Sequence, residues 1–173
     1  TMKKVREEGQ SEVLDGVRRP VTILACELGL LEEDAEKLSA TPGEVTKLIA
    51  AGCAHLKKAI IEIGGAADQA DGGRIFAYFN APLENADHVR DACAGALRLI
   101  ESMDRINLEL QAAPHLQGVQ LHLAIGVATG ECYLGPMGQG RAQRYSAVGR
   151  PMALAAFLSR QAMVYGPAII VDE

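Results

Sequence analysis

The sequence predicts an α+β fold: a ferredoxin-like sandwich in which helices flank a central, mostly antiparallel sheet. Two observations carry this prediction. Segments with apolar residues at helical spacing take turns along the chain with short apolar or strictly alternating segments. The resulting order is strand, helices, strand hairpin, helix, strand hairpin, helix and strand. A chain of 173 residues, 49% of them hydrophobic, is long and apolar enough for one core of this kind.

The first expected element is a buried strand. Residues 1–19 are rich in charged residues and lack an apolar stripe, so we assign them to a leader or linker. Residues 20–173 are expected to form one domain. Within it, Val21–Cys26 is a nearly continuous apolar run, which is typical of a central strand covered on both faces. A short acidic helix is expected to follow at Glu32–Leu38.

A long helix and a strand hairpin come next. Thr41-Pro42-Gly43-Glu44 has capping-box spacing, and apolar residues then recur at helical period until Gly64-Gly65. Two short strand candidates follow, Ala66–Ala70 and Arg74–Phe79. The sequence Asp71-Gly72-Gly73 between them predicts a tight turn.

The C-terminal half contains the second predicted hairpin. A long helix is expected at Ala86–Ala112, and strict alternation over Val119–Val127 predicts a strand with one buried face. Thr129-Gly130 is expected to turn the chain into another strand at Cys132–Leu134. The last expected elements are a helix at 151–164 and a strand at 168–171.

Charge and hydropathy exclude several classes of partner. The net charge of −5 gives no electrostatic indication of nucleic-acid binding. No apolar run reaches membrane-spanning length, so we expect no membrane contact within this fragment. A cytoplasmic location is expected, either free or as the cytoplasmic part of a larger membrane-attached receptor. Thr1 precedes Met2, so we expect Met2 to be an artificial start inside a longer protein.

The cysteines and histidines have no ligand spacing. Cys26, Cys53, Cys93 and Cys132 are far apart and stand in apolar settings. We therefore expect small buried core residues rather than disulfides or metal ligands.

Several ordered segments carry a family resemblance: Val21–Leu24, Gly64-Gly65, Phe76–Pro82, Gly130–Gly135 and Arg144–Pro151. Together they resemble the framework of a class III nucleotide cyclase catalytic domain, over nearly the whole chain after the leader. The resemblance implies a dimer that binds a nucleoside triphosphate at its interface. In that family two aspartates hold two metal ions, a lysine and an aspartate read the purine, and an asparagine and an arginine stabilise the transition state.

The resemblance also locates the metal positions. Glu27 stands where the family has its first metal aspartate, so it is the single retained carboxylate and the one candidate metal ligand. An exposed acid at a strand end is an equally good interpretation of this residue. The second metal aspartate is replaced by Gly73. Asp71 lies two residues earlier, and a turn residue there cannot be assumed to reach the same point.

The base-reading and transition-state positions are changed as well. The resemblance puts Gln69 in place of the purine-reading lysine and Arg150 in place of the purine-reading aspartate. Ala153 replaces the transition-state asparagine, and Phe157 replaces the arginine. Removing one preorganised donor to developing charge costs about 3–4 kcal/mol. Losing several donors together predicts a domain without useful cyclase activity, so we assign no catalytic residue.

The sequence therefore favours a degenerate cyclase homology domain that is regulatory or dimerising in signal transduction. Two alternatives remain open: a divergent adenylate or guanylate cyclase that uses Glu27 and Asp71, and a nucleotide sensor without turnover. No cofactor is expected, or Mg²⁺ or Mn²⁺ if residual nucleotide binding exists. The resemblance also makes a geometric prediction: Glu27 should lie close to the 71–73 turn.

The expected partner is a second copy or another cyclase-like domain. Leu30, Leu31, Met152 and Phe157 are expected near the pairing surface, although a place in the core is equally consistent for Phe157. The family domain continues past a strand like 169–171 into a hairpin with a phosphate-binding basic residue. We therefore expect this chain to be truncated at its C-terminus.

Overall fold

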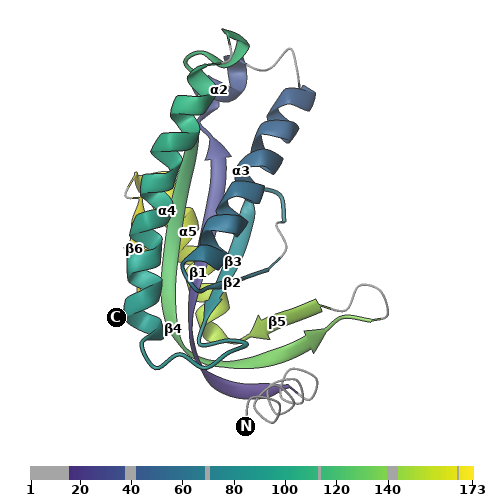
Figure 1. Cartoon of the computed structure of the whole chain (residues 1–173), viewed down its shortest axis with the longest axis vertical. Helices are drawn as coiled ribbons and strands as arrows, with labels where there is room; N and C mark the ends of the chain where they lie inside the picture. The colour runs from purple at the N-terminus through teal and green to yellow at the C-terminus, as the bar shows by residue number, and fades with distance from the viewer. Residues whose placement is uncertain (1–15, 38–41, 69–70, 113, 140–143, 167) are drawn as a thin grey trace.

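A six-stranded sheet forms the centre of the computed structural model, which describes residues 16–37, 42–68, 71–112, 114–139, 144–166 and 168–173. The strand order is β2-β3-β1-β4-β5, and β6 pairs with β4. All pairs are antiparallel except β4 with β6. Helices cover both faces, with α3 and α4 on one side (Figure 1). The predicted α+β sandwich is confirmed.

Two long strands form the middle of the sheet. β1 (Val17–Leu30) pairs along its whole length with β4 (Leu121–Met137). β1 thus begins inside the range 1–19 that the sequence assigns to a leader. The turn expected at Thr129-Gly130 is wrong, because β4 continues through it. The first residues of β1 give residues 131–134 backbone partners, so the chain stays extended there.

The remaining strands are short. β2 (Ala66–Ala67) and β3 (Arg74–Phe79) form the first predicted hairpin, although the part of the first strand at 69–70 lies outside the described residues. The second hairpin pairs β4 with β5 (Arg144–Val148), so its turn follows Met137. β4 and β5 extend away from the helices in Figure 1. β6 (Ile169–Val171) confirms the expected last strand.

The helices agree with their predicted positions. The four helices are α2 (Glu32–Lys37), α3 (Pro42–Glu62), α4 (His88–Gln111) and α5 (Arg150–Tyr165). A 3-10 turn at Pro114–Leu116 lies between α4 and β4. Thr41, the expected cap of α3, lies outside the described residues. Among the described residues, no helix is long and apolar enough to cross a membrane.

Alternation along β1 separates the core into two layers. Leu24, Cys26 and Leu28 pack with α3 and α4, whereas Ile23 and Ala25 pack with α5. Burial on both faces confirms the prediction of a doubly covered central strand. All four cysteines are free; Cys26, Cys53 and Cys132 are buried as expected, whereas Cys93 is only partly buried.

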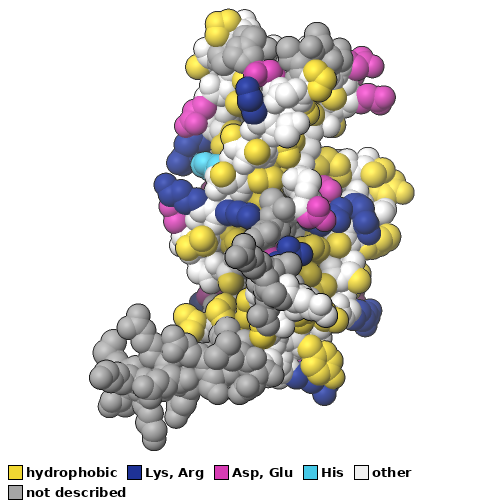
Figure 2. All heavy atoms as spheres, turned by 90° about the vertical axis from the view of Figure 1, so that its right-hand side faces the viewer, with side chains coloured by type: hydrophobic (Ala, Val, Ile, Leu, Met, Phe, Trp, Pro, Cys, Tyr) yellow, Lys and Arg dark blue, Asp and Glu magenta, His cyan; other side chains and the backbone are white. Residues whose placement is uncertain are grey.

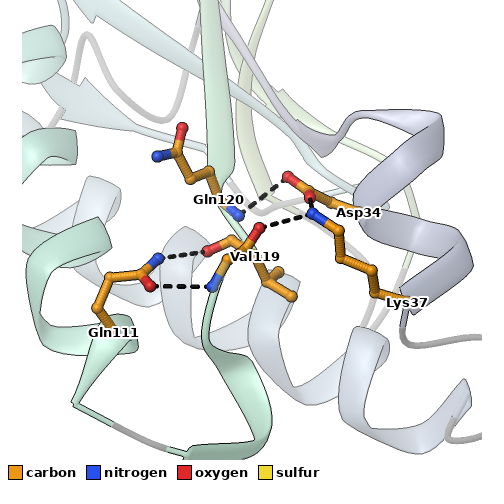
Figure 3. Close-up of polar contacts among 6 residues, drawn as sticks. Asp34, Lys37, Gln111, Val119 and Gln120 are labelled. Carbon is orange, nitrogen blue, oxygen red and sulfur yellow. Dashed lines mark hydrogen bonds and ion pairs between the residues drawn. The ribbon is translucent and has the colours of Figure 1, made fainter.

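A polar cluster, which we call the α2–α4 clamp, holds the start of β4 between two helices (Figure 3). Its members are Asp34 and Lys37 of α2, Gln111 of α4, and residues 118–120. Asp34 Oδ2 accepts the Gln120 N–H at 3.0 Å, and its other carboxylate oxygen accepts Lys37 Nζ at 2.6 Å. Lys37 also donates to the Gly118 carbonyl at 2.8 Å. The clamp thus joins segments that are far apart in the sequence.

On the α4 side of the clamp, the side-chain amide of Gln111 bonds backbone groups as a neighbouring strand would. Gln111 donates to the Val119 carbonyl at 3.1 Å and accepts the Gly118 N–H at 2.9 Å. One turn earlier on α4, Asn107 makes the same two bonds to Leu121, at 3.0 and 2.9 Å. These four bonds satisfy backbone groups that would otherwise be unpaired beside the core.

Candidate functional site

Glu27 and the 71–73 turn lie side by side, as the family resemblance predicts. Glu27 is opposite Arg74 in the β1–β3 register, and Leu28 N–H donates to the Gly73 carbonyl at 2.9 Å. Antiparallel pairing brings the start of β3, with its preceding turn, to the second half of β1. The two positions that would hold metal ions in a cyclase are therefore adjacent in this fold.

The Glu27 carboxylate is engaged by Arg74. Arg74 Nε donates to Glu27 Oε2 at 2.7 Å, and both side chains are about three-quarters buried, with 26% and 24% exposed. Sequence reasoning missed Arg74. The sequence could have indicated it, because the residue after Gly73 must lie opposite Glu27 once the hairpin pairs with β1. This pair, which we call the Glu27–Arg74 pair, satisfies the retained carboxylate within the chain.

Gly73 has no room for a side chain. A Cβ built there would stand 2.0 Å from the Leu28 carbonyl oxygen, which belongs to the backbone of β1. Real Cβ atoms do not approach so closely, and a backbone atom inside the sheet cannot move aside as a flexible side chain can. The position of the second metal aspartate is therefore closed by the path of β1, as well as changed in sequence.

A second carboxylate in this region is enclosed by donors. Asp68, which follows β2, accepts the Tyr78 hydroxyl at 2.7 Å and the Ser146 hydroxyl at 3.2 Å. Arg144 Nε lies 3.9 Å from its other oxygen. Burial, with a further contribution from Asp68, raises the pKa of Tyr78, so the phenol stays protonated and donates. These contacts tie β2, β3 and β5 together.

The two predicted purine-reading residues have different outcomes. Gln69 lies outside the described residues. Arg150 is exposed at the start of α5, where it lines a cavity of about 250 Å³ with Thr129, Glu131 and Asp172. Among the described residues, Arg150 makes no hydrogen bond or ion pair with the Asp68 group.

The transition-state positions lie together on the outer surface of α5. The exposed stripe of this helix consists of Arg150, Ala153, Phe157, Arg160 and Val164. Ala153 and Phe157 are four residues apart and are therefore neighbours on one helix face. Phe157 is 50% exposed, so the alternative that it packs into its own core is wrong. Two apolar groups thus occupy adjacent positions where the family has polar ones.

Of the other predicted surface residues, Leu31 is 47% exposed, whereas Leu30 and Met152 are partly buried on two different faces. Leu30 packs against the core layer under α3 and α4, whereas Met152 packs against the layer under α5. They therefore cannot form one patch. Hydrophobic side chains reach the surface between charged ones on the side shown in Figure 2. The apolar surface beside the old transition-state positions depends on Phe157 and its neighbours on α5.

The described residues do not fit a metal centre. They contain no group of three or more His, Cys, Asp or Glu side chains that could hold an ion. Two-metal chemistry requires carboxylates that converge on both ions. In this region Glu27 and Asp68 are instead bound to Arg74, Tyr78 and Ser146. The charge needed to attract Mg²⁺ is compensated internally.

Comparison with known proteins identifies the fold. The guanylyl cyclase Cya2 superposes with a TM-score of 0.73 at 26% identity, over 84% of this chain and 72% of that chain. The adenylyl cyclase CyaB from P. aeruginosa gives 0.72 at 21% identity, over 86% and 74%. The noncanonical dimeric guanylyl cyclase domain of the RhoGC fusion protein from the aquatic fungus Blastocladiella emersonii gives 0.62 at 18% identity, over 83% and 75%.

Sequence comparison gives a weaker likeness of the same kind. Adenylate cyclase 1 of Rhizobium meliloti (strain 1021) is 24% identical over 133 residues, which are 76% of this chain. The matched region is 19% of that relative, so the chain spans about a fifth of its length. No family model matches the chain.

Proposed function

We propose that this chain, a cyclase-like domain with the fold of class III adenylyl and guanylyl cyclases, makes no cyclic nucleotide and acts in signal transduction by associating with a like domain. The observation that carries the proposal is the closed position at Gly73. A Cβ at residue 73 would stand 2.0 Å from the Leu28 carbonyl oxygen, so this position itself cannot supply a side-chain ligand.

The Glu27–Arg74 pair supports the same conclusion from charge. A metal ion at Glu27 would have to displace a guanidinium hydrogen-bonded at 2.7 Å. The free carboxylate would then be a single protein ligand with no partner at Gly73, whereas hard divalent cations bind several oxygens. Charge-assisted hydrogen bonds are stronger than neutral ones, so replacing the Arg74 guanidinium with a metal ion at Glu27 is unfavourable.

The α5 surface supports the loss of transition-state chemistry. Ala153 and Phe157 supply no donor to a developing negative charge. A half-exposed phenylalanine on the outer stripe of a helix is suited to contact with another protein, because aromatic side chains bury large apolar areas at interfaces. The guanylyl cyclase domain of RhoGC is dimeric, which is consistent with this use of the fold.

A cyclase assay tests the catalytic part of the proposal. The purified chain, incubated with ATP or GTP and either Mg²⁺ or Mn²⁺, is expected to give no cyclic AMP or cyclic GMP above a protein-free control. Product formation that disappears in Glu27→Ala would contradict the proposal. It would favour the divergent cyclase instead, because Glu27 and the exposed Asp71 lie beside the same turn.

Sedimentation tests the association part. We expect a dimer at micromolar concentrations for the wild-type chain, since a closed two-fold pair is the commonest assembly. Phe157→Glu is expected to shift it to monomer. Leu108→Glu is the matched control, because Leu108 is an exposed apolar residue on α4, across the sheet from α5. A strict monomer at high concentration would exclude the homodimer, and equal effects of both variants would exclude Phe157 as its contact.

A nucleotide sensor differs from this proposal in one measurable property. Thermal unfolding with and without ATP or GTP detects any nucleotide that binds the folded chain alone. We expect no shift of the unfolding temperature. A shift without turnover would replace the proposal with a sensor.

A further inference from the structure

A cationic groove lies between α3 and α4, on the opposite face of the sheet from α5. Its cavity measures about 440 Å³, within the range of small-molecule sites. Lys58 on α3 and Arg98 and Arg105 on α4 line it, together with one carboxylate, Glu62. Three cations against one anion form an excess of positive charge in a chain whose net charge is −5.

The two arginines of the groove have no directional partner among the described residues, although the charge of Arg98 contributes to lowering the pKa of Asp91 on the same helix. Within the described part of the chain, neither Arg98 nor Arg105 has a hydrogen bond or ion pair, and both are exposed. Lys58 has only a long contact with Glu62, at 3.9 Å. Guanidinium groups without hydrogen bonds retain their N–H donors, whose fork geometry matches carboxylate and phosphate groups.

The positions of these cations favour a ligand with more than one anionic group. Arg98 and Arg105 are seven residues apart, so they stand on one face of α4 about 10 Å from each other. Lys58 lies across the groove on α3, with the half-buried His55 one turn earlier. Leu99 and Ala59 provide an apolar lining between the charges. This arrangement offers separate anion positions on either side of a short apolar surface.

We propose that the α3–α4 groove binds a small organic polyanion, a phosphorylated or polycarboxylated metabolite, through Arg98, Arg105 and Lys58. Such a ligand contacts both helices that cover one face of the sheet, and so it ties α3 to α4. The site is separate from the α5 surface and from the Glu27–Arg74 pair. Its occupation is therefore independent of whether the domain cyclises nucleotides.

The test is a titration of the full chain at low ionic strength with two probes, inorganic tripolyphosphate and citrate, which separate phosphate from carboxylate recognition. Backbone NMR is expected to show saturable shifts at residues 55–63 and 98–105. Isothermal titration is expected to give an affinity that falls about tenfold or more in the double variant Arg98→Gln/Arg105→Gln. High salt should weaken binding by screening.

Two controls make the result decisive. Arg160→Gln removes an exposed arginine from α5 and should bind both probes as the wild type does. Arg150→Gln tests the cavity at the start of α5. The proposal is overturned if neither probe binds at millimolar concentrations, if the double variant binds like the wild type, or if Arg150→Gln abolishes binding. Unchanged thermal unfolding of the double variant will show that its fold is intact.

Discussion

The α2–α4 clamp and the Glu27–Arg74 pair are both polar groups at the margins of the sheet, yet they differ in what they bind. In the clamp, side chains satisfy backbone groups of other segments: Asp34 accepts from Gln120, and Gln111 bonds Val119 and Gly118. Glu27 and Arg74 bind each other. The clamp thus bonds the backbone of another segment, whereas Glu27, at the family's first metal position, is neutralised by the side chain of Arg74.

The largest expected loss of stability comes from a substitution at Gly73, which lies beside the Glu27–Arg74 pair. Restoring the family residue with Gly73→Asp should destabilise the chain by about 3 kcal/mol or more, because the new Cβ meets the Leu28 carbonyl at 2.0 Å. Chemical denaturation measures the change in unfolding free energy. The fold at this position is thus expected to exclude the catalytic residue rather than merely lack it.

Gly43→Asp is the matched control for that change. Gly43 lies in the first turn of α3 and a Cβ there meets no atom within 4 Å. An acid at a helix N-terminus is favourable, so this variant should be as stable as the wild type or slightly more stable. If Gly73→Asp were equally stable, the account of a closed position would be wrong.

A substitution in the clamp should reduce stability by a smaller amount, and the reduction should depend on pH. Burial raises the pKa of Asp34, but hydrogen bonds from Lys37 and the Gln120 N–H, with the Lys37 charge, outweigh it, so the pKa lies below its ordinary value. Asp34→Asn should therefore cost about 2 kcal/mol at pH 7. The stabilisation from a lowered pKa is complete above the unfolded value of about 3.9 and is lost as pH falls through the folded value.

Denaturation of both proteins as a function of pH tests this sign. The stability difference between wild type and Asp34→Asn should be constant near neutrality and should shrink below about pH 4. Glu36→Gln, at an exposed position of the same helix, is the control and should change little. A difference that grows on acidification would contradict the assigned contacts.

Local pattern was enough to predict most of the fold, and the family resemblance predicted that Glu27 meets the 71–73 turn. The path of β4 through Thr129-Gly130 was not predictable from pattern, because it depends on backbone partners supplied by the first residues of β1. The clamp was missed for a related reason: Asp34 and Gln120 are 86 residues apart and carry no local signal. Tertiary pairing decides both features.

The sequence predicted which residues occupy the candidate site better than it predicted the contacts around them. The resemblance located Glu27, Gly73, Ala153 and Phe157, and the last two do lie on one exposed helix face. It could not give the Arg74 contact, which follows only from strand register, or the clearance at Gly73, which is set by the backbone of β1. Both are properties of packed strands.

Manganese binding tests the central claim most directly, because it measures the metal site without requiring turnover. Electron paramagnetic resonance of free Mn²⁺ in the presence of the chain, with and without nucleotide, counts the bound ions. The account predicts no saturable binding at micromolar Mn²⁺, for the wild type and for the exposed control Glu33→Ala alike. Two Mn²⁺ ions bound per chain by the wild type and by Glu33→Ala, and lost in Glu27→Ala, would contradict it.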